Sequence, residues 1–129
     1  MFRILLAGAI TFASLAPAFA AEKVTVPANR TSGISSFIHY NGDMCRGGAI
    51  PNLRVGKKPK HGKLTFKTVM TKLGPGRCKG VPVKAMAAYY TPDRGFRGKD
   101  AFSVSYTHDL YEGAAGIGST SYSFDITVK

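Results

Sequence analysis

Hydrophobic and polar residues alternate along the last third of the chain. In residues 100–107, Phe102, Val104 and Tyr106 are separated by serines. Residues 119–128 repeat the alternation, with the apolar positions Tyr122, Phe124, Ile126 and Val128. Neighbouring side chains of a β-strand point to opposite faces, so the apolar face of each segment is predicted to lie in a core.

Shorter runs of β-branched and aromatic residues occur earlier in the chain, and no stretch after residue 20 shows a helical period of useful length. Gly and Pro separate these runs, as expected for strands joined by turns. The predicted strands are residues 23–26, 36–40, 52–55, 63–70, 84–91, 100–107 and 119–128. We therefore predict an all-β, Ig-like sandwich of two sheets and about seven strands.

Residues 1–20 have the pattern of a cleavable signal peptide. Arg3 precedes an uncharged apolar segment, residues 4–16, which Pro17 ends before the small-residue pattern Ala18-Phe19-Ala20. The apolar segment is shorter than the roughly 20 residues that a membrane-spanning helix needs. We expect cleavage after Ala20, an exported periplasmic or extracellular protein without a transmembrane segment, and one domain over residues 21–129.

The chain has two cysteines, Cys45 and Cys78. An even number of cysteines in an exported chain indicates a disulfide. On the chain-entropy model, closing this loop contributes about 3–4 kcal/mol to stability. Two free thiols, or a redox pair outside any CxxC motif, are the alternatives.

The charge is strongly positive. The full chain has a formal net charge of +11, which becomes +10 when Arg3 is removed with residues 1–20. Residues 44–92 contain no acidic residue. The densest basic group in that stretch is Lys57, Lys58, Lys60 and Lys63. Such a cluster predicts a polyanion-binding surface, although lysines also increase solubility and block pairing at sheet edges.

Residues 90–102 (YTPDRGFRGKDAF) resemble the YTPxxxFxGxDxF signature of bacterial Ig-like, cadherin-like repeat modules of surface proteins. Residues 59–64 (PKHGKL) are similar to the PxHGxL turn of the same modules. The resemblance covers roughly residues 24–129 and implies a sandwich fold. The matching signature positions are Tyr90, Pro92, Phe96, Gly98, Asp100 and Phe102.

We interpret these signature residues as structural. Pro92 sets the turn that leaves a strand, Phe96 is buried at the end of the sandwich, and Gly98 permits a backbone conformation that is costly for other residues. Asp100 is expected to accept hydrogen bonds from turn amides before its strand. Tandem relatives bind calcium through acidic residues near module junctions. This single module lacks their Asp-rich linker, which leaves Asp93 and Asp100 as the paired candidates.

No motif for catalysis is found in the sequence. The three histidines, His39, His61 and His108, form no local ligand pair, and convergence in the fold would be needed for them to bind copper or zinc. We expect no enzyme, no catalytic residue and no cofactor. The leading hypothesis is an exported binding module for an anionic polysaccharide or other polyanion at the cell envelope. The alternatives are a structural or envelope-protein-binding module with incidental charge, and a periplasmic metal-binding protein. The oligomeric state stays open.

Overall fold

The computed structural model describes residues 21–109 and 117–129. The predicted signal peptide lies outside these residues. The described part of the chain forms nine strands and no helix, so it holds no helix that could cross a membrane. The strands are β1 (Glu22–Val26), β2 (Ser32–Phe37), β3 (Tyr40–Asn41), β4 (Arg46–Gly47), β5 (Arg54–Val55), β6 (Gly62–Lys72), β7 (Pro82–Pro92), β8 (Gly98–Asp109) and β9 (Ile117–Val128).

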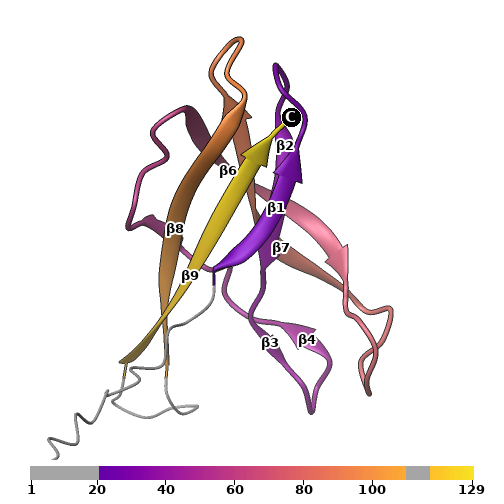
Figure 1. The fold of residues 1–129 in the computed structure, drawn as a ribbon. Coiled ribbons are helices and arrows are strands. Elements are labelled where there is room, and N and C mark those ends of the chain that lie inside the picture. The colour runs from indigo at the N-terminus through magenta and orange to yellow at the C-terminus, as the bar shows by residue number, and fades with distance from the viewer. Residues whose placement is uncertain (1–20, 110–116) are drawn as a thin grey trace, which may run out of the picture.

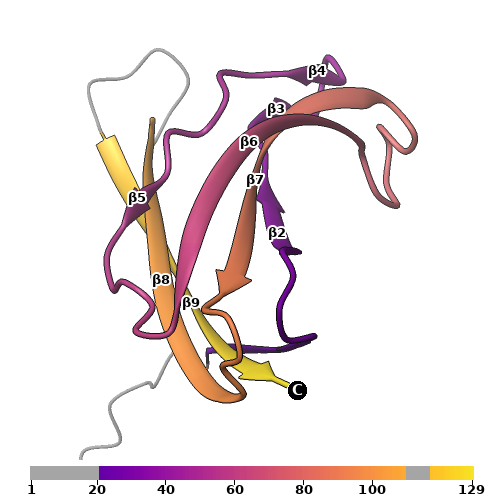
Figure 2. The same cartoon turned by 90° about the horizontal axis from the view of Figure 1, so that it is seen from above.

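Two sheets form the sandwich (Figures 1 and 2). Sheet A has the strand order β1-β9-β8-β5, and sheet B has the order β2-β7-β6. β1 lies parallel to β9, while the other neighbours are antiparallel. The all-β sandwich predicted from the alternation is therefore confirmed.

The core lies between the inner faces of the two sheets. Phe102 and Val104 of β8 are at most 1% exposed, and they face Ala88 and Tyr90 of β7, which are both fully buried. The ring of Phe102 stacks on that of Phe124 at 5.0 Å. Each large apolar side chain buried in this way contributes about 1.5–3 kcal/mol to stability. Five of the apolar positions predicted in β8 and β9 are therefore buried at the centre of the fold, namely Phe102, Val104, Phe124, Ile126 and Val128. The prediction is wrong for Tyr122, which is 39% exposed, and Tyr106 is only half-buried.

One strand prediction is wrong in its position. The second strand was expected at residues 36–40, but β2 ends at Phe37, and the chain then enters a separate short hairpin of β3 and β4. A register shift between Gly33 and Ser35 interrupts β2, so its residues do not show simple alternation. Such a bulge removes the period-two pattern on which the prediction relied.

The β3–β4 hairpin projects from one end of the sandwich (Figure 1). Cys45, at the end of this hairpin loop, forms a disulfide with Cys78, with a Cα–Cα distance of 5.3 Å. Cys78 also packs with Leu73 and Val83 in a second, smaller apolar cluster. The predicted disulfide is confirmed, and neither cysteine is free.

Candidate anion-binding groove

Asp100 connects the two sheets near the start of β8. The residue is 8% exposed, and its carboxylate accepts hydrogen bonds from the backbone amides of Lys60 (2.9 Å), His61 (3.0 Å) and Ala101 (2.9 Å). The hydroxyl of Tyr90, a fully buried residue of sheet B, donates a fourth bond of 2.7 Å. The first two amides belong to the segment between β5 and β6, so the bonds hold that segment against β8.

These contacts explain two opposite pKa shifts. Burial alone would raise the pKa of the Asp100 carboxyl, but the bonds from the Tyr90 hydroxyl and the three amides outweigh it and lower that pKa. Burial, and then the bond to Asp100, raise the pKa of the Tyr90 hydroxyl. Asp100 is therefore ionised and Tyr90 protonated near neutral pH. In this state the carboxylate accepts all four bonds.

The segment between β5 and β6, residues 56–61, is also held at its other end. The amide of Lys57 donates to Ser103 Oγ (2.8 Å), and the Ser103 amide donates to the Lys57 carbonyl (3.0 Å). Gly62 follows this segment, where a Cβ atom would lie 2.5 Å from the Tyr90 ring. Only glycine permits this approach, and it brings β6 close to the tyrosine that bonds to Asp100.

We name residues 56–61 the basic loop. His61 in this loop stacks on Phe96, with ring centroids 4.2 Å apart and planes 9° from parallel. Phe96 is half-buried against the core rather than fully enclosed. Gly98 has a φ of +137°, a conformation that side chains with a Cβ rarely adopt, and Pro92 is buried at the end of β7.

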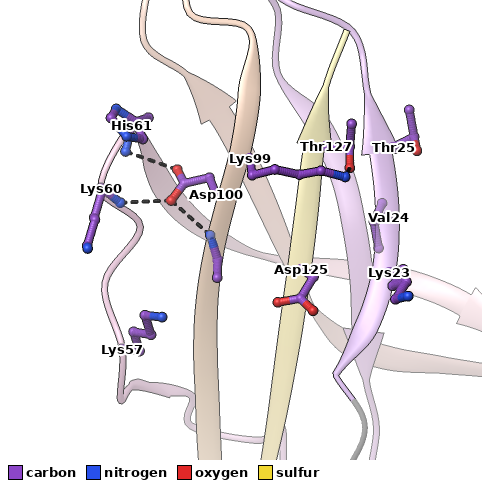
Figure 3. A pocket seen from close by; sticks show the side chains of 11 residues that line it. Lys23, Val24, Thr25, Lys57, Lys60, His61, Lys99, Asp100, Asp125 and Thr127 are labelled. Carbon is purple, nitrogen blue, oxygen red and sulfur yellow. Dashed lines mark hydrogen bonds between the residues drawn. The ribbon is translucent and has the colours of Figure 1, made fainter.

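A groove of about 590 Å³ lies between the basic loop and the outer face of sheet A. Figure 3 shows the basic loop on one side of β8 and the residues of β1 on the far side of β9. Four exposed lysines line the groove, namely Lys23 of β1, Lys57 and Lys60 of the basic loop, and Lys99 of β8.

Two carboxylates also line the groove. Asp100 is occupied by its four hydrogen bonds, and Asp125 lies on β9, where it pairs in register with Lys23 of β1. Lys99 reaches across β9, and its ammonium group donates to Thr127 Oγ1 (2.6 Å; Figure 3). The lysines outnumber the acids, so the groove has an excess of positive charge, and solvent screens it only partly at low salt.

The structure brings together part of the predicted lysine cluster. Lys57 and Lys60 line the groove, whereas Lys58 is exposed on the same loop without lining it and Lys63 lies on β6 of sheet B. Lys23 and Lys99 were missed. Both stand at polar positions of strands, but which strands are neighbours depends on sheet order, and local alternation does not reveal that order.

The histidines of the metal hypothesis do not converge as far as the structure describes them. His39 contacts the ring of Tyr106, while His61 lies beside Asp100 at the other end of β8. Six residues of strand separate those two contacts, about 20 Å. The side chain of His108 lies outside the described residues. Within them, no group of three or more His, Cys, Asp or Glu residues is arranged to hold a metal ion.

Comparison with known proteins gives little information on this chain. No family model and no curated protein match it. Among solved structures, it is similar to a solution structure of Amebosin, with a TM-score of 0.47 and 14% sequence identity over 83% of this chain and 88% of that chain. At this level of similarity, neither the fold nor the function of the chain is inferred from Amebosin.

Proposed function

We propose that this protein is an exported, non-enzymatic module that binds an anionic polysaccharide at the cell envelope through the groove on sheet A. One observation carries the proposal. Four lysines from three separate segments converge on one groove, and the basic loop that supplies two of them is held in place by the buried Asp100. Because the loop is ordered before a ligand binds, little conformational entropy is lost on binding.

The outer face of sheet A favours a linear, sugar-like polyanion. Beyond the groove, two pairs of serines lie side by side on β8 and β9, Ser103 with Ser123 and Ser105 with Ser121. Their outward positions extend a row of hydroxyl groups from the groove along the sheet. The lysine ammonium groups bind carboxylates or sulfates, and the serine hydroxyls exchange hydrogen bonds with sugar hydroxyls. A polysaccharide that carries both anionic groups and hydroxyls therefore matches this surface.

Export and the cadherin-like resemblance are part of the same proposal. The pattern of residues 1–20 and the disulfide support a periplasmic or extracellular location. The resemblance is supported by the way Tyr90, Asp100 and Phe102 of the signature combine. Tyr90 bonds to Asp100, and its ring stacks with that of Phe102 at 6.4 Å. These three signature residues thus form one buried unit at one end of the sandwich.

A salt series with heparin as the probe tests the groove. We expect the affinity of the wild type for heparin to fall steeply with salt. The double variant Lys57→Gln/Lys60→Gln should reduce the magnitude of the slope of log K against log salt by about 1–2. It should also bind heparin about tenfold more weakly at low salt. The protein, residues 21–129, is titrated into labelled heparin, and binding is measured by the fluorescence anisotropy of the label.

The matched control is Lys72→Gln/Lys84→Gln, which removes the same charge from exposed positions on sheet B. We expect this control to lose less than about threefold in affinity, because screened charges outside the contact contribute little. Equal losses in the two double variants would show a diffuse charge effect and no site. Binding that ignores salt would also contradict the proposal.

A further inference from the structure

β6 forms one edge of sheet B, and its hydrogen-bonding pattern follows from two prolines. Pro92 and Pro82 stand opposite Gly62 and Lys72, the two ends of β6. Proline has no N–H, so these positions are not hydrogen-bonded pairs of the antiparallel ladder. Next to them, the Asp93 amide donates to the His61 carbonyl (2.8 Å). The odd-numbered residues of β6 therefore bond to β7.

The even-numbered residues of β6 direct their amides and carbonyls away from β7. They are Gly62, Leu64, Phe66, Thr68, Met70 and Lys72. Within the described chain, none of these outward groups bonds to another segment. Thr68 and Met70 are exposed, and Met70 reaches 62%. An 11-residue strand with a free edge is a template for pairing with a further strand.

Apolar surface accompanies this edge. Sheet A has four strands and sheet B has three, and the basic loop joins β5 directly to β6, so both strands lie at the same side of the sandwich (Figure 2). Val55 of β5 pairs with the fully buried Val104 and therefore faces inward, yet it is 36% exposed. Leu64 and Phe66 of β6 are only partly buried. A fourth strand in sheet B would cover these side chains.

The outer face of the same edge is cationic. Lys63 and Lys67 are exposed on β6, with Thr65 between them, and the Lys67 ammonium lies 5.7 Å from the centroid of the Tyr89 ring. No acidic residue occurs in residues 44–92, which include all of β6 and β7. A strand that pairs here would place alternate side chains beside these lysines, where carboxylates are favoured.

We propose that the edge of β6 binds an extended acidic segment of a partner protein as a fourth, antiparallel strand of sheet B. The segment carries acidic residues at positions i and i+4, opposite Lys67 and Lys63, and apolar residues at i+1 and i+3, opposite Phe66 and Leu64. The β6 strand of a second copy has no acidic residue and so does not meet that pattern. Antiparallel pairing of two β6 edges about Thr65 places Lys63 of each copy opposite Lys67 of the other, and like charges directly opposite are unfavourable.

This edge is a different surface from the sheet A groove, so an experiment can contradict one of the two proposals without contradicting the other. The peptide site uses backbone groups of β6 together with Lys63 and Lys67, whereas the groove uses Lys23, Lys57, Lys60 and Lys99. Binding of a peptide should therefore be retained in Lys57→Gln/Lys60→Gln, and binding of heparin should be retained in a variant that blocks the edge.

The probe is a synthetic peptide of the same length as β6 with a Glu-Val-Thr-Val-Glu centre. Its binding is measured without methylation and in two N-methylated forms. In an antiparallel pair, the residues opposite Leu64 and Phe66 donate to β6, so methylating the two valine amides removes the bonds. We expect this form to bind about tenfold more weakly or worse, because each lost bond weakens binding severalfold. Methylating the two glutamate amides should change affinity by less than about threefold.

On the protein side, Thr68→Pro removes an outward amide without removing a bond to β7, a substitution that edge strands tolerate. We expect Thr68→Pro to weaken peptide binding at least fivefold relative to the matched control Thr68→Ala, with melting temperature measured for both. Lys63→Glu/Lys67→Glu should bind the Glu peptide weakly and a Lys-containing version of it well.

Three results would overturn the proposal. The first is that the unmethylated peptide does not bind, and the second is that the two methylation patterns weaken binding equally. The third is that the protein sediments as a dimer and that Thr68→Pro converts this dimer to a monomer. The last result would assign the edge to a second copy of this chain.

Discussion

Replacing Asp100 with alanine is expected to lower the free energy of unfolding by roughly 3–5 kcal/mol, measured by urea denaturation. The substitution removes the acceptor of the Lys60 and His61 amides and the shorter of the two hydrogen bonds of the buried Tyr90 hydroxyl, which keeps only a bond of 3.3 Å to the His61 carbonyl. Each unsatisfied buried group costs about 1–3 kcal/mol, and water entering beside the basic loop offsets part of the sum.

The matched control is Asp125→Ala, which removes a second carboxylate from the same groove. Asp125 is exposed, so its loss should change stability by less than about 0.5 kcal/mol. Comparable losses for the two variants would mean that the hydrogen bonds of Asp100 contribute little to the fold.

The same carboxylate gives stability a defined pH dependence. The pKa of Asp100 is lower in the folded protein than its ordinary value, so the stabilisation is complete above the unfolded pKa of about 3.9 and is lost as pH falls through the folded pKa. The difference in unfolding free energy between the wild type and Asp100→Asn should therefore be constant from pH 7 to about 5. It should shrink below about pH 4. A difference that grows in acid would have the wrong sign for this mechanism.

Asp100→Asn also separates charge from geometry in the groove. The variant adds one unit of net positive charge, so a purely electrostatic surface would bind heparin more tightly. Asparagine cannot accept all the hydrogen bonds that the carboxylate accepts, so the basic loop should lose its fixed position. Lys57 and Lys60 should then no longer be aligned along the groove. We expect weaker heparin binding than in the wild type at equal salt. Tighter binding would show that the position of the loop is unimportant.

Local alternation was sufficient to predict the centre of the fold. Period-two patterning depends only on the strand itself and on one buried face. It therefore identified the core residues Phe102, Val104, Phe124 and Ile126. The pairing of Cys45 with Cys78 was likewise available from counting, since a chain with two cysteines allows one intramolecular disulfide.

Features that depend on pairing between distant segments were not predictable. The groove needs Lys23 of β1 and Lys99 of β8 on either side of β9, and the parallel pairing of β1 with β9 leaves no local signal. The free edge of β6 likewise follows from sheet order. The β3–β4 hairpin was missed because strands of two residues show no period.

The double variant Cys45→Ala/Cys78→Ala is expected to lose about 3–4 kcal/mol of unfolding free energy, on the chain-entropy model for a separation of 33 residues. Its structural effect should be confined to one end of the molecule. The disulfide joins the hairpin to the small cluster with Leu73 and Val83, at the far end of β6 from the basic loop.

Amide hydrogen exchange should therefore accelerate in residues 38–50 and 73–83 of the cysteine double variant, while the β8–β9 ladder stays protected under native conditions. Heparin affinity should remain within about threefold of the wild type, because Asp100 still holds the basic loop. Uniformly faster exchange through β8 and β9, with loss of heparin binding, would instead mean that the hairpin and the sandwich unfold as one cooperative unit. In that case the disulfide would support the groove from the opposite end of the fold.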